Sequence, residues 1–159
     1  MSSKTLGNLI RISTIFAGLC GLLLCAFILP TLGQGMVEVN PELSGWFWPW
    51  LSFAWLFALP CFAILVYIWK VSTAVIGESV FTIKTAGWVK AGAMLTLGDA
   101  VLLFVGNIVL LVFGMSHPSM LICCTIGAIF AVALALLAAV LSRYLTKAAT
   151  LQEESEGTL

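Results

Sequence analysis

Charged residues are scarce in this sequence of 159 residues, and histidine occurs only once. Only 9% of the residues are charged and the formal net charge is zero, whereas a soluble domain is about one quarter charged. A water-exposed surface of ordinary composition is therefore excluded. The balanced charge offers no basic surface to a nucleic acid. We expect no enzyme activity, no cofactor, no metal and no direct nucleic-acid contact, because no nucleophile–base pair or ligand cluster lies within the apolar runs.

Long apolar runs take the place of charge, and 62% of the residues are hydrophobic. A helix needs about 20 mainly apolar residues to cross the hydrocarbon core of a bilayer. Lipid cannot pair backbone polar groups, and the runs lack the two-residue alternation of barrel strands, so they are predicted helices. The predicted spans are residues 9–32, 46–69, 91–115 and 120–144. We therefore predict an all-α, polytopic membrane protein, a four-transmembrane-helix bundle in a single membrane domain over residues 1–159.

All seven basic residues fall on one side of this arrangement. They are Lys4, Arg11, Lys70, Lys84, Lys90, Arg143 and Lys147. The two loops on the other side carry Glu38, Glu42 and His117 but no lysine or arginine. The positive-inside bias predicts that both termini, the loop 70–90 and the tail 145–159 are cytoplasmic.

Small residues recur every four positions in two of the spans. The fourth span carries Cys123, Gly127, Ala131, Ala135 and Ala139, and the first carries Ala17, Gly21 and Cys25. Such stripes allow two helices to approach closely. We expect them to face other helices, either within the bundle or in a homodimer. The five cysteines lie inside apolar runs at irregular spacing, which favours a packing role over disulfides.

Asp99 is the only acidic residue inside a span. A carboxyl group at this depth is costly, so it should point into the bundle or into a wet cavity. Thr96 and Asn107 lie on the same helix, and the three residues form a candidate intramembrane polar site. One interpretation is an ion or proton site. The other is a single hydrogen bond between helices, with Ser13, Thr14 or Ser52 as the partner.

The cytoplasmic loop and tail carry a second set of candidates. Gly77 is expected to end the helix of span two, and Thr82 to cap a new helix of about 30 residues that runs into span three. The tail ends in three acids within four residues, followed by an apolar residue. A short recognition peptide has this composition.

Residues 77–82, read as Gly-Glu-Ser-Val-Phe-Thr, resemble a loop motif of a bacterial family, domain of unknown function 2975. Residues 151–159 resemble its acidic terminus, and the four-span layout is similar over nearly the whole chain. Val80 and Leu159 depart from the family pattern, in which Pro and Ile are common. The resemblance implies a plasma-membrane protein, often encoded beside an Xre-type helix-turn-helix regulator. Carried over by position, the candidate partner contacts are Phe81, Thr82, Glu153, Glu154, Thr158 and Leu159.

Two functions are compatible with these features. The first is a non-enzymatic protein of the bacterial inner membrane that regulates or anchors a cytoplasmic partner such as a helix-turn-helix transcription factor. The alternative is a small transporter or ion-coupled carrier that uses Asp99. A carrier would usually show more polar residues at midplane, broken helices or internal repeats.

Overall fold

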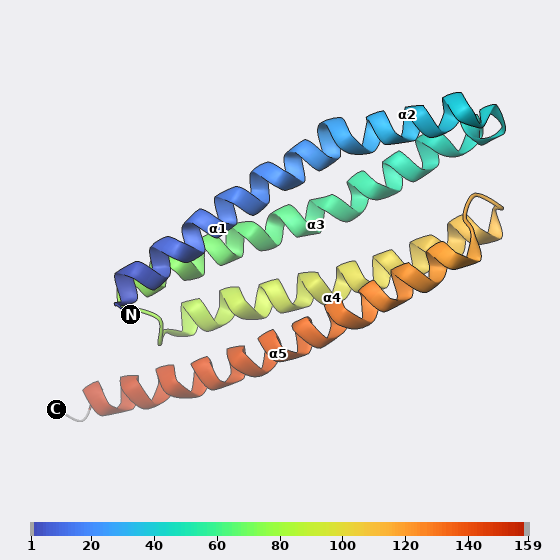
Figure 1. The fold of residues 1–159 in the computed structure, drawn as a ribbon. Helices are drawn as coiled ribbons and strands as arrows, with labels where there is room; N and C mark the ends of the chain where they lie inside the picture. The colour runs from blue at the N-terminus through green and yellow to red at the C-terminus, as the bar shows by residue number, and fades with distance from the viewer. Residues whose placement is uncertain (1, 158–159) are drawn as a thin grey trace.

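Four long antiparallel rods make up the computed structural model, which describes residues 2–157 (Figure 1). The first rod joins α1 (Ser3–Leu23), the π-helical η1 (Leu24–Ile28) and α2 (Leu29–Val39). A 3-10 turn, η2 (Pro41–Leu43), leads into α3 (Ser44–Ile76), which is followed by α4 (Ile83–Val112) and α5 (Pro118–Gly157). The structure confirms an all-α chain, with four helices in the described residues long and apolar enough to cross a membrane.

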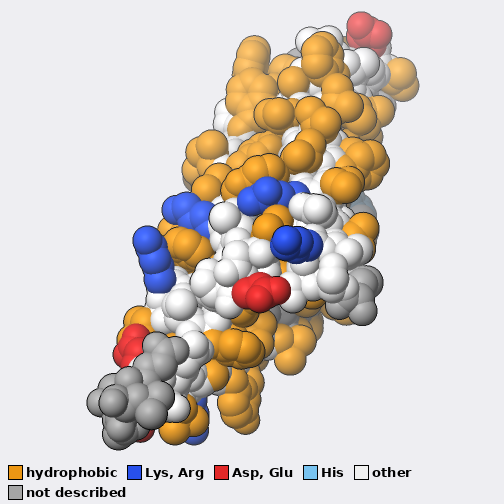
Figure 2. Space-filling view, turned by 90° about the vertical axis from the view of Figure 1, so that its left-hand side faces the viewer, with side chains coloured by type: hydrophobic (Ala, Val, Ile, Leu, Met, Phe, Trp, Pro, Cys, Tyr) orange, Lys and Arg blue, Asp and Glu red, His pale blue; other side chains and the backbone are white. Residues whose placement is uncertain are grey.

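The rods form an open row in which each one packs on the next along the chain. The first rod contacts α3, α3 contacts α4, and α4 contacts α5, and within residues 2–157 no rods that are distant in sequence touch. The start of α1 and the end of α5 lie at the same end of the row (Figure 1). Most large apolar side chains point outward (Figure 2). This inside-out distribution suits a lipid surrounding.

The first rod is longer than the sequence predicted, and it contains one irregular turn. The π-helical turn lies directly before Pro30, whose ring clashes with the carbonyl of residue 26 in a regular helix. The first span is predicted to end at residue 32, but the helix continues through Gly33 and Gly35 to Val39 and ends only at Asn40. A glycine at position 33 fits within this helix because the Phe47 ring of α3 occupies the space that a Cβ atom at this position would fill.

The connection between α3 and α4 matches the prediction closely. α3 ends at Ile76, and Thr82 caps α4 by accepting a hydrogen bond from the Thr85 N–H at 3.2 Å. α4 has the expected 30 residues. The left-handed residue in this connection is Glu78, with φ of 54°, rather than Gly77. The predicted loop 70–90 is therefore helical except at residues 77–82, and the predicted tail continues α5 to Gly157.

Small residues at seven-residue spacing hold α4 against α5. The buried positions are Ala86, Ala93, Ala100 and Asn107 on α4, and Ala128, Ala135, Ser142 and Ala149 on α5; we call these eight residues the alanine seam. Ser142 fixes the register, because its Oγ donates a hydrogen bond to the Ala86 carbonyl at 2.8 Å. The helix backbones thus approach closely enough for a side chain on one to bond the main chain of the other.

Within the bundle, the four-residue stripe predicted for the fourth span is buried only at Ala135, and its alternative role in a homodimer stays a prediction. Cys123 and Gly127 are exposed, and Ala131 and Ala139 are only half-buried. Each four-residue step overshoots one helical turn by about 40°, whereas a seven-residue step falls short of two turns by about 20°. Over a helix of 40 residues, only the seven-residue row stays on one face.

Glycines play the corresponding role between α1 and α3. Gly7 is buried against Ile76, and its carbonyl accepts a hydrogen bond from Ser72 Oγ at 2.7 Å. Gly21 lies against the Phe62 ring, and the Cys25 carbonyl accepts a bond from Trp55 Nε1 at 3.0 Å. Two members of the stripe predicted for the first span, Gly21 and Cys25, therefore face α3, while Ala17 is exposed.

The alanine seam makes a direct prediction about stability. Replacing Ala135 by Leu should destabilise the protein by about 1–3 kcal/mol, because the seam has no room for a larger side chain. The matched control is Ala133→Leu, at an exposed position of the same helix, and it should leave stability nearly unchanged. Thermal unfolding of both variants in detergent micelles is the measurement. Equal melting temperatures would contradict the close approach of α4 and α5.

Candidate functional site

Asp99 is buried between α4 and α3, where its partner is a cysteine. The side chain is 6% exposed, and its Oδ2 accepts a hydrogen bond from the Cys61 thiol at 3.2 Å. Oδ1 is also buried and has no hydrogen-bond partner among the described residues. On the same face of α4, seven residues on, Gly106 packs against the Phe53 ring of α3.

The partners expected for Asp99 are wrong. Ser13 and Thr14 belong to α1, which does not contact α4. Ser52 lies on α3 but is exposed. Depth along the spans would have indicated Cys61, because Cys61 and Asp99 are each the ninth residue from the inner end of their predicted spans in antiparallel helices. A cysteine in an apolar run usually indicates packing, so its sequence context alone does not identify Cys61 as a hydrogen-bond donor.

Asn107 faces α5 rather than α3, so it does not join Asp99. Its side chain is fully buried; Nδ2 donates to Cys124 Sγ at 3.3 Å, and Oδ1 accepts from Ser116 Oγ at 3.4 Å. Thr96 bonds the Gly92 carbonyl of its own helix at 2.9 Å. The three residues of the predicted polar site therefore make separate contacts, and each of the two buried ones meets a thiol.

The adjacent Cys123 and Cys124 point in different directions. Cys124 is turned toward Asn107, whereas Cys123 is exposed on the outer face of α5. Both are free, as are the other three cysteines. Within the part of the chain that the structure describes, no group of three or more His, Cys, Asp or Glu side chains is placed to hold a metal ion.

The basic residues and several aromatic rings meet at one end of the row. The Arg11 guanidinium lies over the Trp69 ring at 5.1 Å and donates a hydrogen bond to Thr73 Oγ1 at 3.0 Å. Lys70 and Lys84 lie 5.9 Å and 5.8 Å from the centre of the Trp88 ring. Figure 2, which views the molecule from this end, shows Lys and Arg side chains spread across it. Such a belt of aromatic and cationic side chains is typical of a membrane–water interface.

The four predicted partner-contact residues that the structure describes lie at this same end. The Phe81 side chain is 56% exposed beside the cap of α4. The Thr82 hydroxyl accepts the hydrogen bond from the Thr85 N–H that caps α4, and it lies 2.9 Å from Thr85 Oγ1. Glu153 and Glu154 are exposed on the last turns of α5. Thr158 and Leu159 lie outside the described residues.

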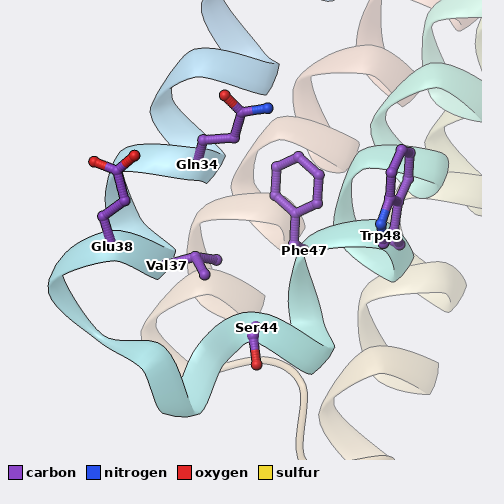
Figure 3. A pocket seen from close by; sticks show the side chains of 6 residues that line it. All are labelled: Gln34, Val37, Glu38, Ser44, Phe47 and Trp48. Carbon is purple, nitrogen blue, oxygen red and sulfur yellow. The ribbon is translucent and has the colours of Figure 1, made fainter.

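A small hollow occupies the opposite end of the molecule. It has a volume of about 240 Å³ and lies between α2 and the start of α3. Gln34 and Glu38 approach it from α2, and the Phe47 ring faces them from α3 (Figure 3). An amide and a carboxylate against aromatic rings provide hydrogen-bonding groups but no nucleophile–base pair.

Comparison with known families gives one match, to the model described as "Protein of unknown function (DUF2975)", over residues 31–159. The match covers well over half of the chain. This chain belongs to the DUF2975 family. No curated protein and no solved structure matches it. The family model extends from α2 to the end of the chain, so the Asp99–Cys61 contact, the alanine seam and the basic end of α5 all lie within the matched residues.

The contact between Asp99 and Cys61 in the DUF2975 chain is testable by a double-mutant cycle. Asp99→Asn and Cys61→Ala should be coupled by about 0.5–1.5 kcal/mol, the range of hydrogen bonds between membrane helices. Unfolding free energies in micelles provide the measurement. The matched control pairs Asp99→Asn with Cys124→Ala, and because Cys124 faces α5 these two changes should add. Coupling of similar size in both pairs would contradict the assignment of Cys61 as the partner.

Proposed function

We propose that this DUF2975 protein is a non-enzymatic protein of the bacterial plasma (inner) membrane that regulates or anchors a cytoplasmic partner. The observation that carries the proposal is the projection of α5 beyond the rest of the row at the basic end. A helix-turn-helix transcription factor is the partner class that suits this end best. The following features support each part of the proposal.

The end of α5 extends past the helix that supports it. Since Ser142 is level with Ala86, the start of α4 at Ile83 is level with residue 145. Ala149 is level with the connection 77–82 and is still buried, with 1% of its surface exposed. The projecting segment therefore begins after it: residues 150–157 are eight residues and span about 12 Å at the helical rise of 1.5 Å per residue. This segment is too polar to enter lipid, and its end lies in water on the side where the termini gather.

The projecting segment combines acidic and apolar surface. Leu151 is 66% exposed, and Glu153 and Glu154 follow it on the helix. Phe81 is a second exposed apolar residue at the same end. Regulators that bind DNA carry basic surfaces for phosphate, so an acidic helix with an apolar anchor has complementary chemistry. Occupation of that basic surface by α5 would compete with DNA.

The distribution of basic residues supports a cytoplasmic location for this end. All seven lysines and arginines lie on the halves of the rods nearest the end where α1 begins and α5 ends. Short loops that are rich in lysine and arginine stay on the cytoplasmic side of bacterial membranes. We therefore place the connection 77–82 and the projecting part of α5 in the cytoplasm.

This orientation predicts how the unmodified protein reacts with amine reagents. Lysine occurs only at the basic end, at positions 4, 70, 84, 90 and 147. A membrane-impermeant amine reagent should leave these lysines unmodified in intact cells and modify them in opened membrane fragments, as mass spectrometry of the purified protein would show. Modification of Lys84 or Lys147 in intact cells would reverse the orientation and move the projecting helix out of the cytoplasm.

Partner binding is tested by reversing charge on the projecting helix. The double variant Glu153→Lys and Glu154→Lys should reduce co-purification of the cytoplasmic regulator from bacterial membranes by about tenfold or more, because like charges then face each other. Deletion of residues 151–159 should abolish it while membrane insertion persists. The matched control, Glu38→Lys and Glu42→Lys, changes the same charge at the opposite end and should have no effect. Unchanged co-purification after the deletion would overturn the proposal.

A second candidate function, a small ion-coupled carrier, is favoured by one observation. The buried Oδ1 of Asp99 has no hydrogen-bond partner among residues 2–157, and an unpaired carboxyl oxygen inside a membrane is able to take up a proton or cation. Loss of ion flux from reconstituted vesicles on Asp99→Asn replacement, with flux retained in the Glu153→Lys and Glu154→Lys variant, would favour the carrier over the regulator.

A further inference from the structure

A groove runs between α4 and α5 at the basic end, and no part of the proposed function uses it. Its volume is about 760 Å³. Three cations line it: Lys90 from α4, and Arg143 and Lys147 from α5. All three side chains are exposed, and no aspartate or glutamate is among the lining residues. Three positive charges around one hollow create a strong field for an anion.

The groove changes in character along its length. Met94 and Val140 line it together with Ala139, and the first two are 62% and 50% exposed. Met94 lies four residues into the membrane from Lys90, a distance of roughly 6 Å along the helix. Arg143 and Lys147 lie on the water side of Val140 by one and two turns. Since Ser142 is level with Ala86, Lys90 is level with residue 138. Ala139 and Val140 therefore lie between Lys90 and Arg143, and Met94 lies on the bilayer side of all three cations.

The depth of the cations matches that of lipid headgroups. Lys90 follows Trp88 by two residues, and Trp88 belongs to the aromatic belt at the basic end. Tyr144, which also lines the groove, is exposed beside Arg143. Tryptophan and tyrosine favour the interface between headgroups and acyl chains. Basic hollows between membrane helices at this level suit anionic headgroups.

We propose that this groove binds one anionic phospholipid, with the phosphate held by Lys90, Arg143 and Lys147 and an acyl chain lying along Met94, Ala139 and Val140. Arginine and lysine supply the hydrogen bonds and charge that a phosphate diester needs. The exposed Met94, on the bilayer side of the cations, argues for a lipid rather than a soluble phosphate, because a soluble anion would gain nothing from surface open to the hydrocarbon core. The lipid would contact both helices of the alanine seam.

The test uses the full chain in detergent, with palmitoyl-oleoyl phosphatidylglycerol as the probe and native mass spectrometry as the readout. The wild-type protein should retain phosphatidylglycerol in preference to phosphatidylcholine of the same acyl chains. The affinity of the groove variant, Lys90→Gln with Arg143→Gln and Lys147→Gln, for phosphatidylglycerol should be lower than that of the wild type by a factor of about ten or more. Equal retention of the two lipids by the wild type would overturn the proposal.

Two further variants separate a groove site from general surface charge. The control variant combines Lys4→Gln, Lys70→Gln and Lys84→Gln, which removes the same charge from the same end but outside the groove. Its affinity for phosphatidylglycerol should be within about twofold of that of the wild type. An equal loss in this control would overturn the groove. Ala139→Trp fills the groove between Lys90 and Arg143 without changing charge and should also weaken binding; wild-type affinity in this variant would overturn the groove as the binding site. Displacement by inorganic phosphate at equal concentration would assign the site to a soluble anion instead.

Discussion

Close approach of helix backbones is the constraint on which this structure depends. In lipid no hydrophobic force draws helices together, so contacts between atoms and hydrogen bonds must do so. Alanine and glycine permit the approach, and serine uses it: Ser72 and Ser142 each reach the main chain of the neighbouring helix. The large apolar side chains are left to face outward. The core of this protein is consequently built from its smallest residues.

The same close approach determines what the buried polar residues contact. Asp99 and Asn107 lie eight positions apart on α4 and face different neighbours, α3 and α5. Each meets a cysteine whose side chain is small enough to fit beside a closely packed helix and polar enough to hydrogen bond. Asn107 is also tied to Ser116 in the turn before α5. It thereby links α4, α5 and the turn that joins them.

The sequence was sufficient to predict features that depend on one helix at a time. The four spans, the cap at Thr82 and the length of α4 follow from local composition and spacing. Features that depend on contacts between two helices were harder to predict from the sequence. The continuation of the first rod through Gly33 depends on the Phe47 ring across the gap. The seam between α4 and α5 does not follow from the sequence alone, because four-residue and seven-residue rows of small residues share Ala135 and only burial distinguishes them. Asp99 was assigned hydroxyl partners because cysteine was not counted as polar.

The alanine seam also relates the membrane part of α5 to its projecting part. Its buried positions continue from Ala128 to Ala149, which lies seven residues beyond the level of Ala86 and so past the start of α4. A single rigid helix therefore carries the seam, the cations Arg143 and Lys147 of the groove, and the acidic surface at Glu153. A ligand that separates or tightens α4 and α5 at the groove would shift the direction in which the last turns of α5 project, because no loop intervenes to absorb the movement. The proposed lipid groove and the proposed partner surface therefore lie on one continuous helix.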